Sequence, residues 1–174
     1  MDLAVLLSPA ELFGISALIL NFIAYRQESA NRYRVVSALA LAALSIHFAI
    51  IGALAGSIVT GMAVIRNIIA LRWQGPIVLW GFVLLNVVLA AYEFSIGTEL
   101  LPLLAAYTSS IIFSVGSIRL NDPEQIRRWF IVAESLGLAY AIMVGSIEGI
   151  IFNLFNLGSI ILKLLQNRRN QTLS

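Results

Sequence analysis

Charge is scarce in this 174-residue chain: charged residues make up 11% of it and hydrophobic residues 60%. A soluble domain carries about 25% charged residues, and a chain this apolar could not keep its surface polar in water. The composition therefore excludes a soluble fold and predicts an integral membrane protein. The apolar runs are continuous, unlike the alternating segments of a membrane β-barrel, so we expect an all-α protein.

Cysteine is absent, and His47 is the single histidine. These absences exclude disulfides, thiolate metal sites and sites that need several histidines. The chain also lacks a glycine-rich phosphate loop, a suitably spaced carboxylate pair and a nucleophile–base set. We therefore expect no enzyme activity, no cofactor and no metal.

The apolar sequence divides into seven candidate spans, since a transmembrane helix needs about 20 apolar residues. The runs 35–71 and 129–165 are too long for one crossing, so each is expected to reverse at a glycine-containing turn. A polar segment, 166–174, follows the last span and is expected to be a cytoplasmic tail. The glycines assigned to the two turns are Gly52, Gly56, Gly145 and Gly149.

Basic and acidic residues fall on opposite sides of the predicted spans. Cytoplasmic loops carry an excess of Lys and Arg, which predicts an outside N-terminus and a cytoplasmic C-terminus. The net charge of +2 comes from these loops, so we do not expect nucleic acid as a partner. The basic residues on one side are Arg26, Arg32, Arg34, Arg66, Arg72, Arg119, Arg127, Arg128, Lys163, Arg168 and Arg169; the acidic residues on the other are Asp2, Glu11, Glu93, Glu99 and Glu148.

The chain matches itself without a gap at an offset of 93 residues. This match predicts a first three-helix repeat at 9–71, a linker span at 77–92 and a second repeat at 99–165. Three spans plus one linker is an even number of crossings, so the repeats would be parallel, an arrangement found in sugar transporters of the SWEET type. The positions that coincide include Arg26 with Arg119, Arg34 with Arg127, Gly52 with Gly145 and Gly56 with Gly149.

Several motifs also resemble a known family. The segment His47-Phe48-Ala49-Ile50-Ile51-Gly52, with Gly56 and Ile65-Arg66-Asn67 after it, is similar to the signature of the YgjV family of bacterial inner membrane proteins. The segments 99–102 and 145–149 resemble that family too, and the resemblance extends from about Leu12 to Leu165. It implies an inner-membrane location and a distant similarity to the SWEET and PQ-loop group, which has Pro-Gln where this chain has Arg26-Gln27.

Three ionisable residues lie within predicted spans, where such groups are costly and tend to face an interior or a cavity. Arg66 and Glu134 are predicted at similar depth, either as a charge pair across the repeats or with Arg66 extended to the headgroups. His47 is predicted near the outer turn. It is either a proton-sensitive group at the mouth or, as we favour, a packing histidine bonded to a backbone carbonyl or a serine such as Ser45 or Ser57.

Amides and hydroxyls within the spans suit a neutral polyhydroxy or amide solute, or alternatively bond one helix to the next. Asn21 and Asn86 are expected to have the second role. The residues predicted to contact a solute are Asn156, Asn67, Arg66, Asn153 and Tyr107.

These features favour a secondary transporter or facilitator that moves a small polar solute through alternating access between the repeats. The partners would be the lipid bilayer and the solute, and a homo-oligomer stays open. The alternative is a non-transporting membrane scaffold or accessory subunit. A hydrated cavity lined by both repeats would distinguish the transporter from the scaffold.

Overall fold

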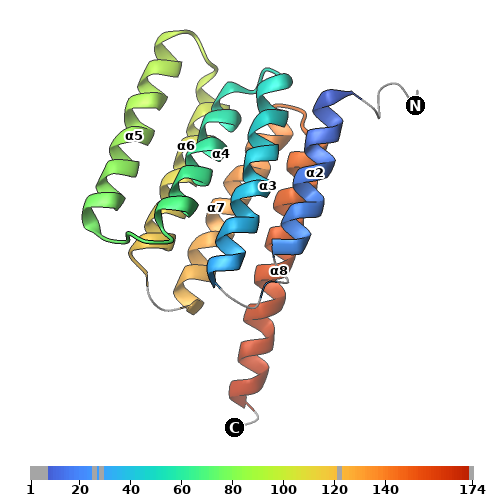
Figure 1. Ribbon diagram of the computed structural model, residues 1–174, viewed down its shortest axis with the longest axis vertical. Coiled ribbons are helices and arrows are strands. Elements are labelled where there is room, and N and C mark those ends of the chain that lie inside the picture. Colours follow the sequence, from blue (N-terminus) through green and yellow to red (C-terminus); the bar gives the residue numbers. More distant parts are fainter. Residues whose placement is uncertain (1–7, 25–26, 28–29, 121–122, 173–174) are drawn as a thin grey trace.

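The computed structural model describes residues 8–24, 27, 30–120 and 123–172, and this part of the chain is all-helical, as predicted (Figure 1). Asp2 and Arg26, which belong to the predicted charge pattern, lie outside the described residues. The helices are α2 (Pro9–Ala24), α3 (Ala30–Ile50), α4 (Leu54–Ile69), α5 (Pro76–Ser95), α6 (Leu100–Ile118), α7 (Pro123–Met143) and α8 (Ile147–Thr172).

The helices run alongside one another, and short connections reverse the chain at the two ends of the bundle (Figure 1). We call the end with residues 51–53, 96–99 and 144–146 the turn end. The opposite end, where α2, α4 and α6 finish, is the basic end, since it carries Arg72, Arg119 and the first turn of α7. The helix α2 begins at the turn end, and α8 ends beyond the basic end (Figure 1).

Four of the described helices, α3, α5, α6 and α8, are long and apolar enough to cross a membrane. The helices α2 and α4 are apolar but have 16 residues each, which corresponds to about 24 Å at 1.5 Å per residue. The helix α7 is 21 residues long but contains Arg127, Arg128 and Glu134. Many exposed side chains are large and apolar, as expected of a surface that contacts lipid.

The first part of the polar segment predicted as a cytoplasmic tail is helical, because α8 continues to Thr172. The sequence breaks in hydropathy near Gln166 but contains no glycine or proline there, so the helix is not interrupted. Backbone hydrogen bonds within a helix need no apolar surroundings, and α8 therefore extends beyond the bundle at the basic end (Figure 1).

The two glycine pairs divide into two roles, which corrects the prediction that all four lie in the turns. Gly52 and Gly145 lie in the turns with φ of +78° and +72°, a conformation that favours glycine. Gly56 and Gly149 instead lie in the first turn of α4 and of α8. A Cβ on Gly56 would lie 2.4 Å from the Tyr140 ring, so this glycine permits a close helix contact.

Helix packing follows one pattern on both sides of the bundle. The helix α2 packs on α3 and α8, and α6 packs on α7 and α4. The helix α5 stands at one edge and contacts mainly α6 (Figure 1). Six helices thus enclose an interior that α5 does not reach.

Candidate functional site: a polar cavity inside the bundle

A cavity of about 160 Å³ lies inside the bundle and is lined by residues of α2, α3, α4, α6, α7 and α8. None of its lining residues comes from α5. From Gly56 to Asn67 it follows α4 over about 16 Å, at 1.5 Å of rise per residue. An engineered apolar cavity of about 150 Å³ holds a benzene ring, so this space fits a solute of about six non-hydrogen atoms.

The structure divides the predicted site residues into two groups. Five of the seven side chains predicted to contact a solute or to carry a charge line the cavity, and two lie elsewhere. Those in the cavity are Asn156, Asn67, Arg66, Asn153 and Glu134; of the remaining predicted residues, Tyr107 and His47 are buried toward the turn end and Gly56 is the one turn-assigned glycine that lines the cavity.

A chain of hydrogen bonds joins three helices at the cavity wall. The Asn21 amide on α2 donates to Asn156 Oδ1 on α8 over 2.8 Å, and the Asn156 amide donates to Glu134 Oε1 on α7 over 2.9 Å. All three side chains are at most 5% exposed. The second carboxyl oxygen of Glu134 makes no hydrogen bond within the described part of the chain, which leaves it available to the cavity.

Arg66 on α4 also lines the cavity and is buried, with an exposed fraction of 7%. Its Nη1 donates to Ser114 Oγ on α6 over 3.3 Å, and the guanidinium lies 5.8 Å from the Phe113 ring centroid. Arg66 Nε has no hydrogen-bond partner although it is buried. The side chain therefore does not extend to the headgroups but points into the bundle.

Arg66 and Glu134 do not form the ion pair that was one prediction for them. An ion-pair contact is found instead at the turn end, where His47 Nε2 lies 3.6 Å from Glu148 Oε2. Arg66 is bonded to Ser114 and Glu134 to Asn156, so each keeps a neutral partner. A buried charge without a counter-charge is costly, and here both groups border a space that water or a solute can enter.

Asn67 and Asn153 complete the polar lining. The Asn67 amide donates to Ser37 Oγ over 3.3 Å, and the Asn153 amide donates to the Gly149 carbonyl over 2.7 Å. A Cβ on Gly137 would lie 2.5 Å from Asn153 Oδ1, so this glycine makes room for the amide. Among the described residues, neither amide oxygen accepts a hydrogen bond, so each can still act as an acceptor.

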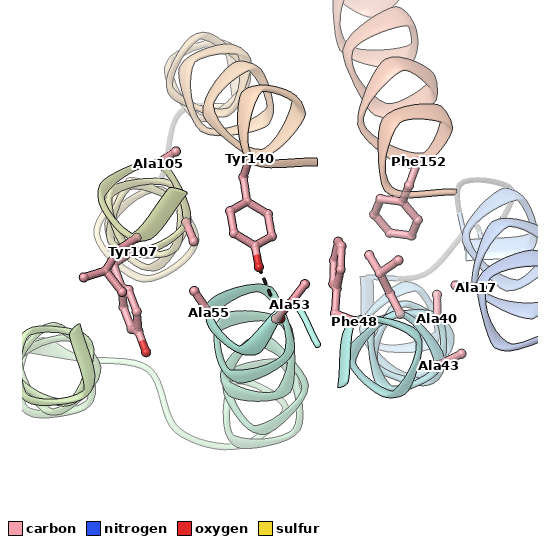
Figure 2. Close-up of a cluster of buried hydrophobic side chains, with 13 residues drawn as sticks. Ala17, Ala40, Ala43, Phe48, Ala53, Ala55, Ala105, Tyr107, Tyr140 and Phe152 are labelled. Carbon is pink, nitrogen blue, oxygen red and sulfur yellow. Dashed lines mark hydrogen bonds between the residues drawn. The ribbon is translucent and has the colours of Figure 1, made fainter. Parts of the chain in front are cut away.

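Aromatic rings close the cavity at the turn end. Phe48, Tyr140 and Phe152 are at most 6% exposed, and the Phe48 and Tyr140 rings pack edge to face with centroids 5.6 Å apart (Figure 2). The Tyr140 hydroxyl donates to the Ala53 carbonyl over 3.2 Å and accepts from the Gly56 amide over 2.6 Å. Tyr140 of α7 is thereby tied to the start of α4.

His47 makes the corresponding contact from α3 to the start of α8. Its Nε2 lies 2.8 Å from Ser146 Oγ, which in turn accepts from the Gly149 amide over 2.9 Å. Its Nδ1 lies 3.0 Å from the Ala10 carbonyl, which can only accept, so Nδ1 carries a proton. The favoured interpretation of a packing histidine agrees with these bonds, although the serine is Ser146 and not Ser45 or Ser57.

Tyr107 lies outside the cavity. Its hydroxyl donates to Glu93 Oε1, and this contact joins α6 to the last turn of α5. Glu93 is fully buried, and its other oxygen has no hydrogen-bond partner. Tyr107 was predicted to contact a solute because it precedes polar residues, of which Ser109 and Ser110 do line the cavity.

Two further side chains belong to the site: Asn21, which was predicted to bond one helix to the next, and Ser114, which was not predicted as a site residue. Both bond across helices, and their partners are polar groups of the cavity. The available signal was their position, because they are 93 residues apart. Polar residues at equivalent positions of the two halves indicate that both lie at the same depth in the bundle.

The fold and the cavity define a helical membrane protein with a polar interior. A family model described as "bacterial inner membrane protein", Imp-YgjV, matches residues 8–171. The chain belongs to this family, which confirms the resemblance predicted from its motifs. No curated protein and no solved structure matches the chain.

Proposed function

We propose that this chain is a secondary transporter or facilitator for a small polar solute in the bacterial inner membrane. One observation carries the proposal: six helices surround a cavity that contains a buried arginine and a buried carboxyl group without joining them. A scaffold gains nothing from such groups, since a polar interior without partners costs stability. In this proposal the protein catalyses no chemical reaction, and Glu134 and His47 therefore have no catalytic role.

The proposed architecture has two parallel three-helix repeats, α2–α4 and α6–α8, and α5 as their linker. The packing supports it, because α2 contacts α8 as α6 contacts α4. The turn-end bonds support it as well. His47 and Tyr140 are 93 residues apart, and each bonds the start of a helix in the other half. His47 bonds Ser146, whose hydroxyl accepts from the Gly149 amide, and Tyr140 bonds both Ala53 and Gly56.

The proposed orientation places the basic end in the cytoplasm and the turn end outside, as the positive-inside rule requires. Cavity residues at the basic end, such as Tyr33 and Ser117, are partly exposed, whereas Phe48 and Tyr140 at the turn end are buried. We infer that the described conformation is open to the cytoplasm and closed to the outside. Transport would require both turn-end contacts to separate.

A thermal-shift screen of the purified protein against a library of small polar metabolites tests the proposal. We expect at least one compound to raise the melting temperature, since a ligand that binds only the folded state stabilises it. Asn156→Ala should abolish the shift. Asn86→Ala is the matched control, because Asn86 is a buried amide on α5 that bonds its own helix and does not line the cavity.

Asn156→Ala also removes a partner from Asn21 and Glu134, so a second variant separates binding from folding. Ala63→Leu adds volume at a cavity wall without removing a hydrogen bond. It should fold and lose the shift. The absence of any hit, or a hit that both variants retain, contradicts the proposed function.

A further inference from the structure

We propose that the cavity binds a small zwitterion, with its acidic group on Arg66 and its ammonium group on Glu134. This inference rests on the proposed function, because it names the solute class of the same cavity. It was not expected from the sequence, which pointed to a neutral polyhydroxy or amide solute.

The anion-binding half of the site is the guanidinium of Arg66. A guanidinium has five N–H donors in a planar fork. The described part of the chain provides one acceptor, Ser114 Oγ, and places no carboxylate near it. Arg66 Nε is buried and unbonded, so donors remain for an acceptor that enters the cavity. A carboxylate fits this fork, since it can accept two parallel hydrogen bonds.

The cation-binding half is the carboxyl group of Glu134. Asn156 donates to its Oε1 and is itself held by Asn21, so the carboxyl group has a fixed orientation. Its other oxygen has no hydrogen bond among the described residues. An ammonium group has three donors and suits this free acceptor.

The placement of the two groups favours one molecule that carries both charges. Arg66 lies on α4 and Glu134 on α7, and both line one cavity while remaining too far apart for an ion pair. A singly charged solute would satisfy one of them and leave the other without a counter-charge at membrane depth. A zwitterion satisfies both, and the cavity volume limits it to about six non-hydrogen atoms.

Four compounds with six non-hydrogen atoms each test the two charges separately. Alanine carries both charges, lactate carries only the carboxylate, alaninamide carries only the ammonium group, and lactamide carries neither. Binding to the purified wild-type protein is measured by isothermal titration calorimetry at neutral pH. We expect alanine to bind about tenfold or more tightly than lactate or alaninamide, because each charge adds a charge-assisted hydrogen bond.

Two conservative variants assign each preference to a residue. In Arg66→Gln the preference for alanine over alaninamide should fall to near unity, while the preference over lactate remains. In Glu134→Gln the preference over lactate should be lost instead. Size-exclusion chromatography and the melting temperature check folding, and the wild-type ranking alone still tests the proposal if a variant does not fold.

The outcomes separate this inference from the proposed function. Equal binding of all four compounds, or tightest binding of lactamide, overturns the zwitterion and leaves a transporter of neutral solutes. A library hit with no binding of alanine also overturns it. No hit in the metabolite screen and no binding of the four compounds overturn both.

Discussion

The two halves of the chain are similar at the turn end of the bundle and dissimilar in the layer that contains the cavity. At the turn end, His47 and Tyr140 occupy equivalent positions, and each bonds the start of a helix in the opposite half: His47 bonds the Ser146 hydroxyl, and Tyr140 bonds backbone groups of Ala53 and Gly56. In the cavity layer, the residues 93 positions away from Arg66 and Glu134 are Ser159 and Leu41. In the proposed transporter, closure at the turn end would depend on matching contacts from both halves, whereas the two halves would contribute different chemical groups to solute recognition.

The proposed function gives a physical reason, because the two regions would then have different tasks. Closing a bundle around a two-fold axis needs matched contacts on either side of that axis. Binding a small solute needs groups that match a molecule without such symmetry. A sequence that repeats in two halves is therefore compatible with a polar site that is not symmetric.

Gly56→Leu should cause the largest loss of stability, because it fills the space of the Tyr140 ring and breaks the turn-end contact. A Cβ there would lie 2.4 Å from Tyr140 Cε1, and overpacking of this kind costs about 3 kcal/mol. The melting temperature in detergent measures the loss. Gly81→Leu is the control, since nothing lies within 4 Å of a Cβ at Gly81 on α5. Equal losses in the two variants would mean that the contact does not hold the turn end.

Tyr140→Phe and Ser146→Ala test whether the two turn-end contacts are equivalent. Each variant removes a hydroxyl that bonds a helix start, and each should cost about 1–2 kcal/mol for the unsatisfied buried groups. Chemical or thermal unfolding in detergent gives the difference. Tyr92→Phe, at an exposed tyrosine, should cost nothing measurable. A loss in one variant and none in the other would contradict the symmetry of the turn end.

Ala63→Asn should change the free energy of unfolding least, because the cavity has room for another polar side chain. Ala63 is the counterpart of Asn156 at the offset of 93 residues and lines the cavity. We expect a change below about 0.5 kcal/mol, as for a residue that contacts water. Ala133→Asn is the control, because Ala133 is fully buried and an added amide there would lack space and partners. Similar losses in both would indicate a dry, closed interior.

Much of the fold could be predicted from the sequence, since lipid leaves helices as the solution for continuous apolar runs and glycines mark the reversals. Gly56 and Gly149 were placed in the turns because a sequence cannot show that the Tyr140 ring or the Phe48 ring will contact a helical glycine. The end of α8 was missed because hydropathy marks the membrane boundary and not the end of a helix.

The candidate site was predictable in part. Polar groups within spans tend to face an interior, and this rule located Arg66, Glu134 and Asn156. Partner choice was not predictable, because it depends on which helices adjoin. Arg66 was paired with Glu134 from depth alone, whereas the packing of α4 on α6 brings it to Ser114. Tyr107 was misplaced for the same reason, since its face of α6 contacts α5.

Cysteine accessibility is the most direct test of a cavity that opens to the cytoplasm, and the absence of native cysteine makes it clean. Ser117→Cys places a thiol in the cavity at the basic end, and Ser95→Cys places one on the exposed turn end as a control. In membrane vesicles of both orientations, a membrane-impermeant maleimide should label Ser117→Cys from the cytoplasmic side and Ser95→Cys from the outside. A solute that stabilises the protein should slow the first reaction and leave the second unchanged. Labelling of Ser117→Cys only from the outside, or from neither side, would contradict an inward-open transport cavity.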